Sequence, residues 1–131
     1  MLGSDNKSTA LILIRVALAA TMFIHGGSRI SFGTVGGFGK YLSGEGFPLG
    51  FYLAWAITLF EIVGSVLLAV GVYAWVVALI FAAQLIAGVA MVHWKEGWFV
   101  VGHGRNGMEF SALLIVCFLA TALANYKRIG R

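Results

Sequence analysis

The sequence contains few charged residues for its length. Only 11% of its 131 residues are charged, namely nine Lys or Arg and five Asp or Glu, whereas 60% are hydrophobic and the mean hydropathy is +0.94. Soluble domains carry about 25% charged residues, and a small chain needs polar side chains to cover its large surface. The composition therefore excludes a soluble globular monomer and a disordered chain. It predicts that lipid surrounds most of this protein.

Cysteine occurs once, as Cys117 within an apolar run. A single thiol cannot form an intramolecular disulfide, so the sequence excludes a secreted fold held together by disulfides. It also excludes a membrane thiol oxidase that passes electrons through its own cysteine pairs, because such an enzyme needs at least two thiols. We interpret Cys117 as a small hydrophobic residue of the core.

The charge balance is basic, with a net charge of +4 and a sequence pI of about 9.6. The basic residues are dispersed and do not form a platform with aromatic residues, so we expect no nucleic-acid partner. They are better interpreted as anchors near anionic lipid headgroups. Their one tight cluster is Lys127, Arg128 and Arg131 at the end of the chain.

Four apolar segments are long enough to cross a bilayer, which takes about 20 residues. They cover residues of about 9–30, 51–71, 74–94 and 108–126, and Gly71 separates the second from the third. We expect the first segment to be a helix of the mature protein and not a signal peptide, because Arg15 interrupts it and its apolar run continues beyond the small residues. The sequence thus predicts an all-α integral membrane four-helix bundle in a single domain. Four spans place both termini on one side, and the basic cluster at the end favours the cytoplasmic side.

Two long loops are expected at the opposite face, residues 31–50 and 95–107. The first contains seven glycines and the only proline, Pro48, together with several aromatic residues. A flexible linker would contain glycine and serine without aromatics. We therefore expect loops that pack onto the mouth of the bundle or lie in the membrane interface, where functional residues are often placed.

Several polar residues interrupt the apolar segments, and each costs about 2.5–3.5 kcal/mol in the hydrocarbon core if ionised. Glu61, near the middle of its helix, either pairs with Arg15 or is protonated, and we predict the pair with Arg15. Gln84 should lie about 180° from His93 around their helix. We expect Gln84 to form an interhelical hydrogen bond outside the site that contains His93.

His25, Arg29, His93 and Glu109 all lie near the ends of helices that meet the two long loops. Each has a simpler explanation: the histidines could cap helices or lie in the interface, and Glu109 could complement the helix dipole. Arg15, at the other end, could extend to the membrane surface. The convergence of four such residues on one membrane face nevertheless predicts a functional site there.

A set of motifs resembles the DoxX family over residues of about 10–125. The matching positions are Arg15, Phe23-Ile24-His25-Gly26, Arg29, Phe38, Gly46, Pro48, Glu61-Ile62-Val63-Gly64, Gly71, His93 and Glu109. The resemblance implies a small four-helix protein of the bacterial or archaeal inner (plasma) membrane. Some members are linked to quinone-dependent oxidation; one branch resembles the small subunit of thiosulfate:quinone oxidoreductase, and another is associated with redox homeostasis and detoxification. Family members often have Lys where Arg29 stands, and the two are not interchangeable at a bidentate site.

The favoured hypothesis is a redox-associated subunit that binds a quinone and works with a partner oxidoreductase, because the chain has no electron carrier of its own. A quinone needs hydrogen-bond donors and a proton relay within an apolar slot. His25 and His93 would donate, Glu109 would return the proton, and Arg29 would favour the reduced ligand. The predicted catalytic residues are His25, Glu61, His93 and Glu109. The predicted quinone-binding residues are Arg15, Arg29, Trp94 and Trp98, with the segment from Trp94 to Phe99 excluding water.

Three other functions stay open. His25, His93 and Glu109 could form a metal site of two histidines and one carboxylate. Glu61 could be the acid of a small proton-coupled transporter that assembles with copies of itself. The polar mouth could also bind a soluble or membrane-bound enzyme in a non-catalytic assembly subunit. The sequence does not identify the substrate or the oligomeric state.

Overall fold

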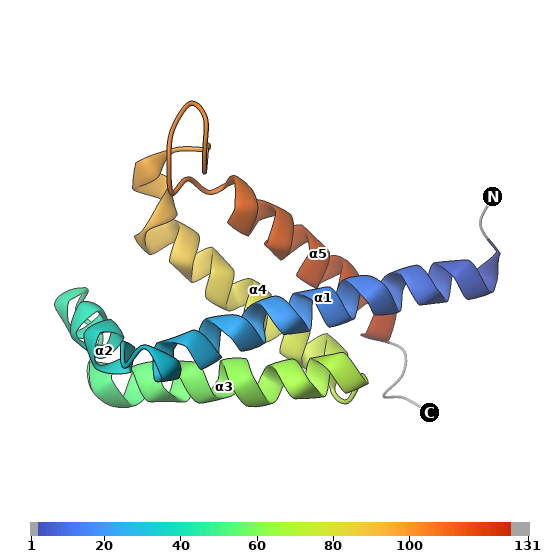
Figure 1. The fold of residues 1–131 in the computed structure, drawn as a ribbon, viewed down its shortest axis with the longest axis horizontal. Helices are drawn as coiled ribbons and strands as arrows, with labels where there is room; N and C mark the ends of the chain where they lie inside the picture. The colour runs from blue at the N-terminus through green and yellow to red at the C-terminus, as the bar shows by residue number, and fades with distance from the viewer. Residues whose placement is uncertain (1–2, 127–131) are drawn as a thin grey trace.

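The computed structural model describes residues 3–126, and it is helical without strands over that range (Figure 1). The helices are α1 (Ser4–Ser31), α2 (Val35–Gly44), α3 (Gly50–Val70), α4 (Ala74–Met91), the short 3₁₀-helix η1 (His93–Glu96) and α5 (Glu109–Asn125). The predicted all-α fold class is confirmed. The basic cluster at positions 127–131 lies outside the described residues.

Three of these helices, α1, α3 and α4, are long and apolar enough to cross a membrane. The last helix, α5, is also apolar but has 17 residues. Many of the apolar side chains on all four helices are exposed, Leu13, Val63, Ile86 and Leu123 among them. Because exposed apolar side chains of this number are unfavourable in water, the structure is that of a membrane protein.

The helices pack as two groups, with α1 and α2 on α3 in one and α4 with α5 in the other. Figure 1 shows α1 running along α3, whereas α4 and α5 cross behind α1 and diverge from it toward their connecting loop. The beginning of α1 and the end of α5 lie at the same end of the bundle, called the terminal end below. The first turns of α1 extend past the other helices there, and its residues 4–14 are all exposed.

The main hydrophobic core explains this divergence, since it fills the terminal half of the bundle. Its fully buried members include Met22 of α1, Leu68 of α3, Phe81 of α4 and Phe118 of α5. A second, smaller core joins only α2 and α3 through Val35, Leu42 and Ala54, with partly buried side chains around it. The two groups of helices are therefore held together at the terminal end and separate toward the end that carries the loops.

The segment 31–50 was expected to be a loop, and this prediction is wrong, because it contains α2. The physical reason is close packing that the composition does not reveal. Gly39 lies against the start of α3, where an added Cβ would be 2.9 Å from the Cα of Phe51. Glycine, which disfavours helices in isolation, here allows α2 to approach α3 and bury Val35 and Leu42.

The turn between α3 and α4 is where the sequence predicted it. Gly71 has a φ of +85° and ends α3, a conformation that glycine adopts without strain. By contrast, the helix expected over 74–94 ends earlier, at Met91. Val92, with a φ of −119° and a ψ of −61°, is the residue between α4 and η1, and His93 and Trp94 lie in the tighter turn of η1.

Candidate functional site

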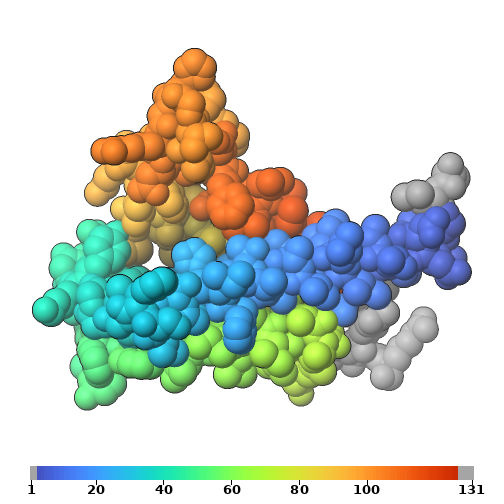
Figure 2. All heavy atoms as spheres, viewed as in Figure 1, coloured from blue at the N-terminus to red at the C-terminus, as the bar shows by residue number. Residues whose placement is uncertain are grey.

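A cavity of about 850 Å³ lies between the two groups of helices, toward the end that carries the long connections. Every helix contributes to its wall, and so do residues Val100, Asn106 and Gly107 of the loop before α5. Most lining side chains are apolar, and the polar ones are few. Figure 2 shows the recess between α1–α2 and the loop above α5. A cavity of this size and character is typical of sites for small apolar ligands with a polar group.

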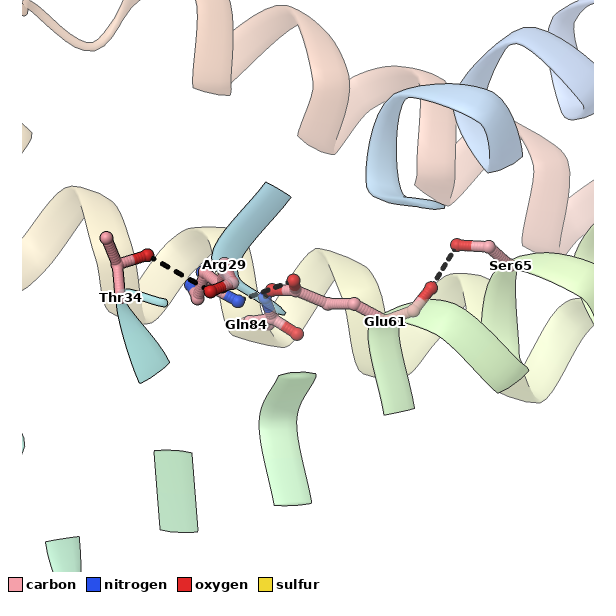
Figure 3. A network of polar contacts seen from close by, with 5 residues as sticks. All are labelled: Arg29, Thr34, Glu61, Ser65 and Gln84. Carbon is pink, nitrogen blue, oxygen red and sulfur yellow. Dashed lines mark hydrogen bonds and ion pairs between the residues drawn. The ribbon is translucent and has the colours of Figure 1, made fainter. Parts of the chain in front are cut away.

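Glu61 is the centre of the polar part of the cavity wall. Its side chain is fully buried, and its Oε2 accepts a hydrogen bond from Arg29 Nη1 at 2.6 Å, which makes an ion pair between α3 and α1. Its Oε1 accepts a hydrogen bond from Gln84 Nε2 of α4 at 2.5 Å. Ser65 donates to the backbone carbonyl of Glu61 one turn further along α3. Figure 3 shows the carboxylate between Arg29 and Gln84. A buried charge is thus compensated on both oxygens.

The predicted pair of Glu61 with Arg15 is therefore wrong. The antiparallel packing of α1 on α3 places Arg29, not Arg15, opposite Glu61. Arg15 instead lies at the terminal end, where it donates to the carbonyl of Ala69 at 3.3 Å and to Asn125 Oδ1 at 3.4 Å. It does not line the cavity.

Gly26 explains why α1 and α3 approach so closely at this level. A Cβ at position 26 would lie 2.9 Å from the Cβ of Glu61 and 2.9 Å from the carbonyl oxygen of Thr58. No side chain fits there. Because Gly26 has no side chain, the backbone of α1 can lie directly on α3. Arg29, one turn further along α1, then reaches the carboxylate of Glu61.

Arg29 is held from a second side by α2. Its guanidinium carbon lies 4.4 Å from the centre of the Phe38 ring, a cation–π contact. Thr34, the residue before α2, donates through both its backbone N–H and its hydroxyl to the carbonyl of Arg29. The helix that the sequence did not predict thus fixes the position of the arginine, whose side chain keeps 19% of its surface exposed.

The structure brings both predicted histidines to the cavity wall. His25 lies one turn before Arg29 on α1 and is largely exposed. His93 lies across from it in η1, and its Nδ1 is 2.8 Å from the carbonyl oxygen of Asn106. If Nδ1 carries the proton and donates to that carbonyl, Nε2 is left as an acceptor.

Three other predicted site residues lie away from the cavity. Glu109 begins α5 and accepts a hydrogen bond from the backbone N–H of Val100 at 3.1 Å. It therefore orders the loop instead of facing the ligand space. Trp94 and Trp98 are exposed on the outside of η1 and the loop, so the expected aromatic wall is not formed by them. Phe38, Phe60 and Phe110 line the cavity instead.

The alternative metal set is not assembled. Over residues 3–126, no group of three or more His, Cys, Asp or Glu side chains lies close enough to hold a metal ion. His25 and His93 share the cavity, but Glu109 is engaged with Val100 and lies outside its lining.

The prediction that Gln84 lies outside the site that contains His93 is wrong. Its interhelical hydrogen bond is confirmed, but the partner is Glu61, and Gln84 lines the same cavity as His93. The helical-wheel argument failed because α4 ends before His93, and η1 turns that side chain back toward the cavity. A polar amide within an otherwise apolar helix was the signal that could have identified it.

Comparison with known proteins gives one result. The family model DoxX matches residues 10–94, which include most of α1 and all of α2, α3 and α4. Curated proteins and solved structures give no significant match to the chain.

Proposed function

The chain belongs to the DoxX family of membrane proteins, and from that premise we propose that it binds a quinone in the cavity as part of a redox system. The observation that carries the proposal is the cavity itself, apolar over most of its wall and interrupted by Arg29, Gln84 and two histidines. A quinone has the matching chemistry: a flat apolar ring with two oxygens that accept hydrogen bonds.

The residues present fit such a ligand. Glu61 is saturated by Arg29 and Gln84, so it needs no further partner. Arg29 has five N–H groups, and only one of them is committed to the carboxylate. The remaining N–H groups and the imidazole of His25 are donors on the wall of an apolar space. These donors match the two ring oxygens.

Each of these residues has a distinct role in the proposal. When bound, the quinone supplies the capacity to accept two electrons and two protons. The guanidinium of Arg29 stabilises negative charge on the reduced ligand. His25 donates a hydrogen bond and passes on a proton. His93, whose Nδ1 faces the carbonyl of Asn106, donates to the ligand from the opposite wall through Nε2 when both of its nitrogens carry a proton. Glu61 and Phe38 act as positioning residues, because they hold Arg29 in place.

The electrons come from outside this chain in the proposed function. A single cysteine provides no pair of redox thiols, so a partner oxidoreductase or the reduced substrate itself delivers the electrons. We place the protein in the inner membrane with both termini in the cytoplasm. The open end of the cavity then faces the opposite side of the membrane.

Binding of a short-chain quinone to the purified protein tests the proposal. Equilibrium binding of a radiolabelled short-chain quinone should saturate at one site per chain. His25→Ala and His93→Ala should each weaken binding about tenfold, the equivalent of one hydrogen bond of about 1.4 kcal/mol. His103→Ala is the matched control, because His103 lies on the exposed loop and contacts Phe99 outside the cavity.

A second variant tests the cavity without removing a polar group. Gly88 lines the cavity, and a Cβ added there meets nothing within 4 Å. Gly88→Leu should therefore fold normally and abolish quinone binding by filling the space. Saturable binding that is equal in Gly88→Leu and the wild type, or no binding by the wild type, would contradict the proposal.

A further inference from the structure

Arg15 is a buried cation whose donors are incompletely used. Only 8% of the residue is exposed, and its Nε has no hydrogen-bond partner among residues 3–126. Its two other contacts are long, at 3.3 and 3.4 Å, and both are to neutral oxygens. Within residues 3–126 the only ion pair is that of Arg29 with Glu61, so no described carboxylate neutralises Arg15. Buried charges are normally paired.

A second unused donor lies at the same end of the bundle. The indole Nε1 of Trp75, in the first turn of α4, is buried and has no hydrogen-bond partner in the part of the chain that the structure describes. Both donors adjoin the turn between α3 and α4 and the end of α5. Gly71 packs on the Arg15 guanidinium four residues before Trp75, and Tyr126 stacks on Trp75 next to Asn125, which contacts Arg15. Two donor-only groups therefore lack an acceptor in one region.

The surroundings indicate which acceptor could reach them. Arg15 lies where α3 ends, α4 begins and α5 ends, which in a membrane protein is near the level of the lipid headgroups. The neighbouring side chains of Val70, Val72, Tyr73 and Leu123 are apolar and exposed. Such a surface suits acyl chains, and a guanidinium next to an indole N–H suits a phosphate.

We propose that Arg15 and Trp75 form a binding site for a phosphate group, carried by the headgroup of an anionic lipid. Both donors are covered in this structure, so binding requires the neighbouring side chains to move aside. The phosphate then accepts hydrogen bonds from Arg15 Nε and Trp75 Nε1 and neutralises the buried charge. The site is at the terminal end and is independent of the cavity between the helices.

Lipid titration of the delipidated full chain in detergent tests this site. Phosphatidylglycerol should bind saturably and raise the unfolding temperature, whereas a diacylglycerol with the same acyl chains and no phosphate should do neither. Arg15→Gln should weaken phosphatidylglycerol binding at least tenfold. Trp75→Phe, which keeps the ring but removes the N–H, should weaken it severalfold. Arg105→Gln, on the exposed loop at the other end, is the matched control and should bind like the wild type.

The outcomes separate the sources of the phosphate. If inorganic phosphate competes with the lipid at millimolar concentration and stabilises the protein alone, the site still binds phosphate but takes it from solution. Equal stabilisation by diacylglycerol would overturn the proposal, as would unchanged lipid affinity in Arg15→Gln or in Trp75→Phe. If Arg15→Gln does not fold, Trp75→Phe alone decides the matter.

Discussion

Arg29 of α1 and Glu61 of α3 form a buried ion pair, with 2.6 Å between Nη1 and Oε2. Gln84 adds a third helix through the other carboxylate oxygen. The cluster therefore links both groups of helices at the wall of the cavity. Its integrity should control both stability and the shape of the site.

Removal of one partner of the ion pair should be costly. We expect Glu61→Gln and Arg29→Gln each to lower the free energy of unfolding by about 3–5 kcal/mol, because each leaves a polar group without its partner in the interior. The value for Glu61→Gln should be at the lower end, because the group that it leaves unpaired, Arg29, is partly exposed, whereas Arg29→Gln leaves the fully buried carboxylate of Glu61. The double variant should lose less than the sum of the two. Unfolding in mixed micelles measures these differences.

The control for this prediction is a second pair of variants. Arg15→Gln combined with Glu61→Gln should give additive losses, because Arg15 contacts Ala69 and Asn125 and not Glu61. Coupling between positions 15 and 61, with additivity between 29 and 61, would contradict the observed pairing.

A side chain at position 26 should separate α1 from α3. In Gly26→Ala the new Cβ would meet Glu61 and the backbone of Thr58 at 2.9 Å, and overpacking of this kind costs about 1–3 kcal/mol. Gly27→Ala is the matched control, since a Cβ there meets nothing within 4 Å. It should be neutral or stabilising by up to about 1 kcal/mol because alanine favours helices. Thermal unfolding of both variants tests the close contact at Gly26. Equal destabilisation of Gly26→Ala and Gly27→Ala would contradict it.

The unexpected helix α2 can be tested in the same way. Gly39→Ala should destabilise the protein by about 1–3 kcal/mol, because its Cβ would lie 2.9 Å from the Cα of Phe51. Gly37→Ala, in the same helix but facing open space, should not. Hydrogen exchange of residues 35–44 should be protected in the wild type and faster in Gly39→Ala. Rapid exchange of this segment in the wild type would show that α2 does not form.

The single native cysteine makes the orientation measurable. In a Cys117→Ala background, Lys7→Cys and His103→Cys place one thiol at each end of the bundle. A membrane-impermeant maleimide applied to intact cells should label His103→Cys, whereas Lys7→Cys should react only after lysis. The reverse pattern would place both termini outside the cytoplasm.

Some properties of the site could be predicted from single residues. Arg29, His25 and His93 were identified because charged or polar residues in apolar helices are costly and therefore informative. Their helix positions indicated the correct end of the bundle, and all three line the cavity. Glu109 was identified for the same reason, but it accepts a hydrogen bond from Val100 in the loop and does not line the cavity. The cost of placing a charged residue in a membrane shows that it needs a partner and does not show which partner it has.

The sequence by itself determined that this is a helical membrane protein and that its chain turns at Gly71. Hydrophobicity and the backbone freedom of glycine are local properties of the chain, so both could be recognised without the tertiary structure. Only the tertiary structure decided which cation meets Glu61. That choice depends on the register of α1 against α3, which is set by the close approach at Gly26. It also depends on α2, whose glycines disfavour a helix until α3 provides a surface on which to pack. Pairing between distant segments is a property of their packing, and no single segment contains it.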